Sequence, residues 1–266
     1  MRLGCSTLLY GGYSLAEALT RIKAADYDAI ELAAIPGMAE HLSADGSGNY
    51  YREVRQRVED AGLAIESVGA STNLLDPEKR TRFESLMRAA ALLGAPAITT
   101  GPGGVPDDET SFAAVVQTVH ELATIAAVHE VKISLKPHAG QAVYTTPTAL
   151  RLLGEVDRTW VGINFDASHL YRADEDVVAS LATLAPHLAT CRIRDIAGKQ
   201  PGPGPVENQI PGKGVLALEA LVAAIRGLAL PYVTLEIVGA RSLPIEEVDR
   251  VIRESLAYLA PRLRDD

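Results

Sequence analysis

Short apolar segments alternate with longer amphipathic segments along the whole chain, and this alternation constrains the fold more than any other feature. The apolar segments are typical of buried parallel strands, and the amphipathic ones are typical of helices that cross back over a sheet. Eight such pairs in 266 residues predict a single (β/α)8 TIM barrel over residues 1–266. An open doubly wound sheet is the alternative, but the early Gly11 and Gly12 do not form the glycine fingerprint of a dinucleotide fold.

Local signals mark the ends of several predicted helices. Ser14 and Glu17 have the spacing of a capping box at a helix start. Pro77 stands at the first position of another helix, and Gly94 follows its end. The longest irregular stretch is the loop 197–214, which we expect to act as a lid over the site.

Composition and charge exclude several classes of protein. The net charge is −9 and the chain has no basic stretch, so we expect no nucleic-acid binding. No run of about 18 apolar residues is present, which predicts that no segment spans a membrane. The two cysteines, Cys5 and Cys191, suggest neither a disulfide framework nor a zinc-knuckle spacing, and they fit a reducing cytoplasm. The expected partner is therefore a small-molecule substrate.

Alternate residues of each barrel strand point inward, and the strands' carboxyl ends form the active-site face. Parity along the strands predicts that six charged side chains point into the mouth of the barrel. They are Glu31, Lys136, Asp166, Arg192, Arg194 and Glu236. His138 keeps the face of Lys136, and His169 follows Asp166 by three residues. Buried charges must pair or be used, so the alternative to a functional site is an ion-pair network that only closes the barrel.

Five motifs give the chain a family resemblance. They are "YDAIEL", "FDASHL", "RIRD", "PGKGVL" and "LEIVG". With them the chain resembles the xylose isomerase-like barrel superfamily of sugar (phosphate) isomerases and epimerases, which also contains inosose-processing enzymes and endonuclease IV. The resemblance implies a divalent ion held at four positions, which here are Lys136, Asp166, Arg192 and Glu236. Members often pair, so a homodimer is expected too.

Two of those four positions depart from the family pattern. Lysine has no acceptor and arginine keeps its proton, so neither binds a hard divalent ion while charged. We therefore expect no cofactor, with Lys136 and Arg192 standing in for the metal. The alternative is a shifted site in which Asp166, Glu236 and His169 hold manganese, magnesium or zinc.

The resemblance implies an isomerase or epimerase that acts by proton transfer next to a carbonyl of a sugar, polyol or hydroxy-carbonyl compound. The catalytic candidates are Glu236, Lys136, His169 and Glu31; the substrate-binding candidates are Arg192, Arg194, His138 and Asp166. Glu31 has the alternative of pairing with Arg194 or Lys136. Lys136 has the alternative of forming a Schiff base.

Two other functions remain open from the sequence. A lyase, dehydratase or cyclase of secondary metabolism could use the same scaffold, since a fold does not fix a function. A non-catalytic partner subunit is the third possibility. A wide apolar mouth would favour the lyase, whereas hydroxyls and charges around the mouth would favour a sugar enzyme.

Overall fold

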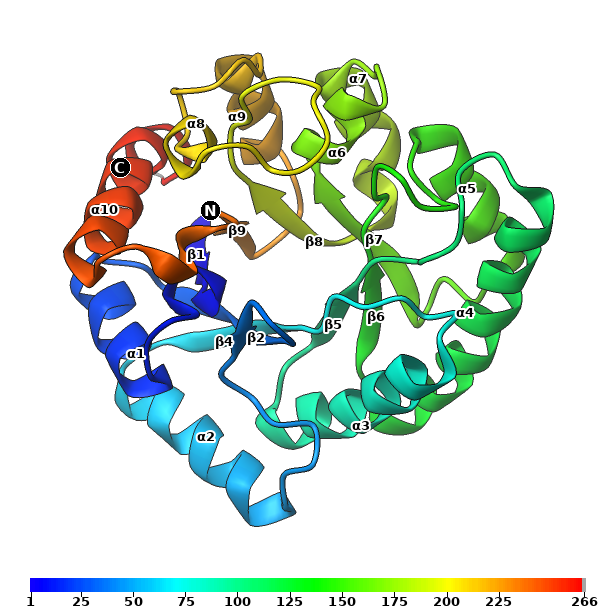
Figure 1. Ribbon diagram of the computed structural model, residues 1–266, viewed down its shortest axis with the longest axis horizontal. Helices are drawn as coiled ribbons and strands as arrows, with labels where there is room; N and C mark the ends of the chain where they lie inside the picture. The colour runs from blue at the N-terminus through cyan, green and yellow to red at the C-terminus, as the bar shows by residue number, and fades with distance from the viewer. Residues whose placement is uncertain (265–266) are drawn as a thin grey trace.

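A closed barrel of parallel strands forms the centre of the computed structural model, which describes residues 1–264 (Figure 1). Its strands are β1 (Arg2–Ser6), β2 (Ala29–Ile35), β4 (Ala64–Gly69), β5 (Ala97–Thr100), β6 (Lys132–Leu135), β7 (Val161–Asp166), β8 (Leu188–Ile193) and β9 (Tyr232–Leu235). Strand β1 pairs with both β2 and β9, which closes the sheet. A short strand, β3 (Ala39–Glu40), pairs antiparallel with the end of β2. The predicted (β/α)8 barrel is thus confirmed.

Helices form a ring around the barrel (Figure 1). They are α1 (Leu15–Ala24), α2 (Gly48–Asp60), α3 (Pro77–Leu93), α4 (Glu109–His129), α5 (Thr146–Glu155), α6 (Ala167–Arg172), α7 (Val177–Leu184), α8 (Val206–Gln209), α9 (Leu218–Arg226) and α10 (Ile245–Leu263). Within the described residues there are also three 3-10 turns: η1 (Thr7–Tyr10), η2 (Ala185–His187) and η3 (Ala240–Ser242). By length and composition alone, α4 is the one helix of residues 1–264 that passes for a membrane span. Its Val115, Val119 and Leu122 are buried in the protein core, which is the ordinary position of a barrel helix.

The main apolar core lies between the strands and the helix ring. Ile30, Ile133 and Phe165 come from three different strands and have no exposed surface. Cys5 and Cys191 belong to the same core and are unpaired thiols, as predicted. Because these outward-facing side chains are apolar, the inward positions of the same strands are left for polar residues.

The helix ends follow the predicted local chemistry. Ser14 and Glu17 form both hydrogen bonds of the capping box at α1. Pro77 occupies the first turn of α3 behind the N-cap Asp76. Gly94 ends α3 with φ of 72° and ψ of 21°, a left-handed conformation that costs a non-glycine residue free energy.

Substituting Gly94 by alanine should therefore destabilise the protein. We expect Gly94→Ala to lower the free energy of unfolding by about 1 kcal/mol, because the new Cβ disfavours the left-handed conformation. Gly154→Ala is the matched control: Gly154 lies inside α5 with open space around its Cβ position, and we expect it to raise stability by about 0.5–1 kcal/mol. Urea unfolding of the two variants measures both effects, and equal changes of the same sign would contradict the conformational explanation.

Candidate active site

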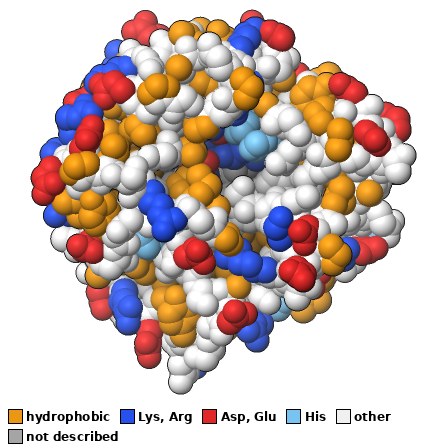
Figure 2. Space-filling view, viewed as in Figure 1, with side chains coloured by type: hydrophobic (Ala, Val, Ile, Leu, Met, Phe, Trp, Pro, Cys, Tyr) orange, Lys and Arg blue, Asp and Glu red, His pale blue; other side chains and the backbone are white. Residues whose placement is uncertain are grey.

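A cavity of about 480 Å³ opens at the face formed by the strands' carboxyl ends. Histidine and cationic side chains gather in its hollow (Figure 2). All eight predicted site residues lie at this end of the barrel, on or just after five of the strands. Two of them, Arg192 and Asp166, do not line the cavity; the other six do.

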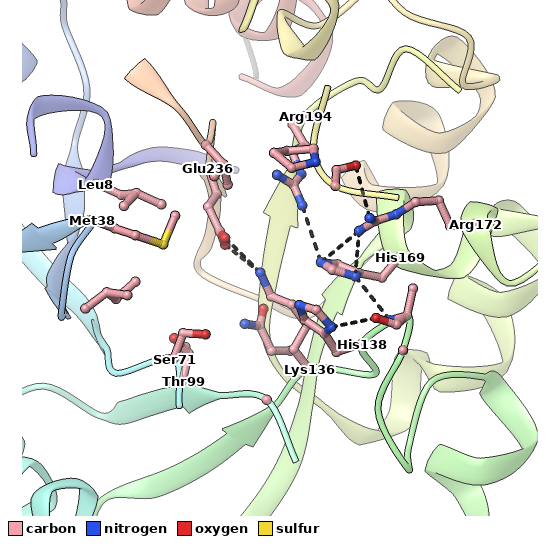
Figure 3. Close-up of a pocket in the computed structure, with 18 of the residues that line it drawn as sticks. Leu8, Met38, Ser71, Thr99, Lys136, His138, His169, Arg172, Arg194 and Glu236 are labelled. Atoms are coloured by element: carbon pink, nitrogen blue, oxygen red, sulfur yellow. Dashed lines mark hydrogen bonds and ion pairs between the residues drawn. The ribbon is translucent and has the colours of Figure 1, made fainter. Parts of the chain in front are cut away.

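Lys136 lies between two carboxylates at the bottom of the cavity, and its contact with one of them, Glu236, is drawn in Figure 3. Its Nζ donates to Asp166 Oδ2 at 3.1 Å and to the two oxygens of Glu236 at 2.9 and 2.8 Å. Arg194 Nη2 also donates to Asp166 Oδ2, at 3.2 Å. Burial alone would raise the pKa of Asp166, but Arg194 and Lys136 outweigh it and hold that pKa well below its usual 3.8. The carboxylate therefore stays ionised and keeps the cations in place.

A second ion cluster lies deeper in the barrel around Arg192. Its Nη2 contacts Glu31 Oε2 at 2.5 Å, its Nη1 contacts Glu66 Oε1 at 2.5 Å, and its Nε lies 3.4 Å from Glu236 Oε2. Burial would raise the pKa of Glu31, yet Arg192 and Lys136 bring the pKa below its usual value. Burial raises the pKa of Glu66, and Arg192 only partly offsets that effect. Glu236 joins the two clusters into one network.

Glu66 is a site residue that strand parity misses, and the reason is a β-bulge. In the β2–β4 ladder Ile30 pairs with Ile65 and Glu31 pairs with Ser67, so Glu66 is an extra residue without a partner. A bulge redirects the side chain of the extra residue. Strict alternation would place Glu66 outside, whereas its carboxylate accepts from Arg192 inside the barrel.

The structure corrects three expectations. Arg192 was expected to bind substrate, but its side chain has no exposed surface, because Glu31 and Glu66 enclose it. Asp166 was expected to bind substrate too, but its side chain is 1% exposed and its oxygens already accept from Lys136 and neighbouring donors. Glu31 pairs with Arg192 rather than with Arg194 or Lys136. Lys136 and Arg192 were both expected to stand in for the metal ion, but only Lys136 lies between Asp166 and Glu236.

His138 and His169 stack at the rim, with ring centroids 4.0 Å apart. Burial and Lys136 lower the pKa of His138 to about 4, and burial lowers that of His169 well below 6.5 although Asp166 opposes the shift. Both rings are therefore neutral at pH 7. His138 Nδ1 faces the carbonyl oxygen of Ala139, which only accepts, so Nε2 keeps a lone pair. His169 Nδ1 instead accepts from Arg172.

Asn164 and Arg172 line the cavity but were not among the predicted site residues. Asn164 is 1% exposed, and neither atom of its amide has a hydrogen-bond partner within residues 1–264. An unpaired buried amide is costly, so it is suited to bind a polar group of a ligand. Asn164 lies two residues before Asp166 on β7, so the alternation that places Asp166 inside the barrel also places Asn164 there. Arg172 ends the short helix α6, where the alternation of strand residues gives no signal.

Residues 197–214 lie beside the cavity and include α8; their role as a lid stays a prediction. Lys199, Pro201 and Gly202 contribute to the cavity wall. The end of the loop is held by Asp195, which accepts from the backbone N–H of Gly212 at 3.1 Å. A Cβ on Gly214 would lie 2.2 Å from Asp195 Oδ1. The "PGKG" motif thus anchors the loop through Asp195.

The donor set at this site does not fit a divalent ion. Lys136 Nζ occupies the space between Asp166 and Glu236, and Arg192 lies behind Glu236. Both cations lack an acceptor. Within residues 1–264 no group of three or more His, Cys, Asp or Glu side chains is arranged to hold a metal. Asp166, Glu236 and His169, the alternative ligands, therefore form no such group, and Lys136 lies between the two carboxylates.

Removing Arg192 should destabilise the barrel strongly. Arg192→Met leaves Glu31 and Glu66 buried without a cation, and we expect a loss of about 3–5 kcal/mol in the free energy of unfolding at pH 7. Arg80→Met is the control, because Arg80 pairs with surface carboxylates of the helix ring, and it should cost less than about 1 kcal/mol. Adding Glu31→Gln and Glu66→Gln should restore part of the loss. A change for Arg192→Met no larger than for Arg80→Met would contradict the buried-cluster interpretation.

Stability should fall as pH falls from 6.5 towards 4. The native pKa of His138 is about 4 and its usual value is 6.5, so the unfolded chain binds this proton first. The stability that depends on a neutral His138 is complete above pH 6.5 and is lost as the pH falls from 6.5 to about 4. Urea unfolding between pH 7.5 and 4 measures the slope, and His138→Gln should reduce it by up to about 1.4 kcal/mol per pH unit, the value for one proton. An unchanged slope would contradict a neutral buried His138.

Curated relatives cover only part of the chain. An inosose dehydratase of Salmonella typhimurium is 25% identical over 92 residues, 35% of this chain and 31% of the relative. A 3-dehydroshikimate dehydratase of Bacillus anthracis is 29% identical over 82 residues, 31% of this chain and 29% of the relative. The chain thus matches about a third of the length of these enzymes.

Solved structures match over the whole chain. The IOLI protein, solved with a bound zinc atom, has a TM-score of 0.81 at 20% identity and covers 100% of both chains. A 3-keto-D-glucoside 4-epimerase, YcjR from E. coli, has a TM-score of 0.75 at 19% identity, covering 98% of this chain and 99% of that one. At these identities the likeness shows the fold. The family model described as "Xylose isomerase-like TIM barrel" matches residues 19–262, and the chain belongs to that family.

Proposed function

We propose that this protein is an isomerase or epimerase that moves a proton next to the carbonyl of a small hydroxylated compound without a divalent ion. The observation that carries this proposal is the position of Lys136, whose ammonium lies between Asp166 and Glu236 at the bottom of the cavity. A cation at this point stabilises the negative oxygen that forms when a carbonyl compound loses its α-proton. The inward Asn164 amide supplies a further donor and acceptor for a substrate hydroxyl or carbonyl.

His138 is the base that the geometry favours. Its Nε2 lone pair is free and the ring lines the cavity, whereas both oxygens of Glu236 already accept from Lys136. His169 is less suited, because its Nδ1 lone pair accepts from Arg172. In the proposed step His138 takes the α-proton, the C–H electron pair forms the enolate, and the carbonyl oxygen gains charge beside Lys136. In epimerisation a proton from solvent adds to the other face of the enolate and His138 passes its proton to solvent. In isomerisation His138 gives its proton to the neighbouring carbon, and the α-hydroxyl proton moves to the former carbonyl oxygen.

A dehydratase is the second candidate, and two observations favour it. Both curated relatives described above are dehydratases. One wall of the cavity is apolar, with Leu8, Met38 and Val238 among its residues (Figure 3). From the same enolate, loss of a β-hydroxyl group as water gives an unsaturated ketone. The two functions therefore share the first step and differ in the fate of the enolate.

Solvent deuterium exchange tests the shared step. The protein, freed of divalent ions with a chelator, is incubated in D2O with inosose, 3-dehydroshikimate and a set of ketoses, and proton NMR follows the α-hydrogen. We expect exchange on at least one compound, with a deuterated epimer or isomer in the first case and an absorbing unsaturated product in the second. No exchange on any compound would contradict the proposal and favour a non-catalytic partner subunit. Exchange that appears only after manganese, magnesium or zinc is added would refute the metal-free step.

Variants assign the roles within that assay. Lys136→Met should lower the exchange rate about 100-fold or more, because the forming oxyanion loses its cation. Lys213→Met is the matched control, since Lys213 pairs with Glu207 and Glu254 outside the cavity, and it should leave the rate unchanged. His138→Gln should also lower the rate about 100-fold while leaving the Lys136 cluster intact. Full exchange activity in His138→Gln would assign the base to Glu236 instead.

A further inference from the structure

The charges around the cavity are unevenly distributed. Four cationic side chains line it: Lys136, Arg172, Arg194 and Lys199. The two carboxylates in its wall, Glu31 and Glu236, are both held by buried cations. The two rim histidines are neutral, as shown above. Lys199 pairs with Asp174, and Lys136 and Arg194 pair with the buried carboxylates, so among the described residues the charge left without a carboxylate in this wall is that of Arg172.

Arg172 is the cation whose charge is least compensated. It makes no ion pair with a carboxylate of residues 1–264; its acceptors are the carbonyl oxygens of Ser168 and Gly202 and the Nδ1 atom of His169. The nearby Asp166 is already shared by Lys136 and Arg194. Burial and the neighbouring Arg194 lower the pKa of Arg172, which shows that its surroundings disfavour a further positive charge.

The hydrogen bonds of Arg172 also fix its orientation. A guanidinium has five N–H donors, and the three contacts use one hydrogen each on Nε, Nη1 and Nη2. One hydrogen on each terminal nitrogen is left, and a guanidinium with free hydrogens on both terminal nitrogens is suited to bind a carboxylate or phosphate. His169 holds one arm of the guanidinium and the backbone of Gly202 holds the other, so the guanidinium is positioned before a ligand arrives.

The cavity wall opposite Arg172 is apolar and places a second requirement on the ligand. Leu8 and Met38 face the cavity across from His169 and Arg172 (Figure 3). An apolar wall packs well against the carbon atoms of a ligand, but it is an unfavourable environment for a charged group. A ligand that matches both walls has a carbon skeleton with an anionic group at one end.

We propose that Arg172, beside Arg194 and supported by His169, binds an anionic group of the substrate, either a carboxylate or a phosphate ester. The proposal rests on the proposed function in taking the occupant of this cavity to be the substrate. It narrows the substrate class from hydroxylated carbonyl compounds in general to acidic ones. Neutral sugars would leave the Arg172 guanidinium without an anionic partner.

Anion binding without turnover tests this subsite. Malonate and inorganic phosphate are titrated into the protein by calorimetry at constant ionic strength, with malonamide as the neutral counterpart of malonate. We expect either anion to bind at least about tenfold more tightly than malonamide, and Arg172→Gln to weaken that binding about tenfold or more, which is the contribution of one charge-assisted pair. Arg172→Lys should retain part of it, since the charge remains while the guanidinium is lost. The ratio of malonate to phosphate affinity distinguishes a carboxylate site from a phosphate site.

The matched control is Arg151→Gln. Because Arg151 pairs with Glu109 on the outer surface, this variant should bind both anions as the wild type does. Equal affinity for malonate and malonamide in the wild type would overturn the proposal, and so would equal anion binding by the wild type and Arg172→Gln. The wild-type comparison holds even if Arg172→Gln does not fold. Arg172-dependent anion binding without deuterium exchange would refute the proposed reaction but not the subsite, whereas exchange on neutral ketoses that is independent of Arg172 would refute the subsite alone.

Discussion

One ammonium group holds the top of this barrel together. Lys136 lies between Asp166 and Glu236, two carboxylates that arrive from different strands and would repel each other in a nearly dry space. Arg192 does the same for Glu31 and Glu66 one layer deeper. Without these cations the inward carboxylates would have to bind protons or a metal ion. The shape of the cavity floor follows from where these cations lie, and Lys136 adds to the burial that keeps the pKa of His138 low.

An ammonium group and a divalent ion offer different contacts to a substrate. A divalent ion binds several substrate oxygens at once, whereas an ammonium offers three directional hydrogens and a single charge. In this chain the hydrogens of Lys136 already point to Asp166 and Glu236. We therefore expect Lys136 to act on a substrate oxygen through its charge, while further hydrogen bonds to the substrate come from other groups, among them Asn164 and Arg172.

The fold was predictable because its signals are local. A period of two in the strands, a period near 3.6 in the helices and end signals such as Pro77 and Gly94 act within a few residues. The site was predictable where parity is regular, as at Lys136 and Asp166. Parity failed at Glu66 because a bulge, which depends on the pairing of two strands, reverses the direction of a side chain.

Other features of the site depend on contacts between distant parts of the chain. Which carboxylate pairs with Arg192 is decided by the three-dimensional packing of β2, β4 and β8, so sequence reasoning left Glu31 with the wrong partners. Arg172 lies at the end of a six-residue helix, α6, where neither the strand period nor the helix period indicates direction. The Asn164 amide lacks hydrogen-bond partners within residues 1–264. That depends on all the side chains around it, so the sequence alone does not reveal it.

The loop 197–214, which we expect to act as a lid, is anchored by Asp195 and Gln209. Asp195 accepts from the backbone of Gly212, and Gln209 donates to the backbone of Gly204 and Val238. The segment 198–203 lies between these anchored points, lines the cavity and contacts Arg172 through the backbone of Gly202. We expect side-chain substitutions in this segment to change which molecules enter the cavity more than they change the stability of the barrel, so that substrate range can diverge while the strand ends stay the same.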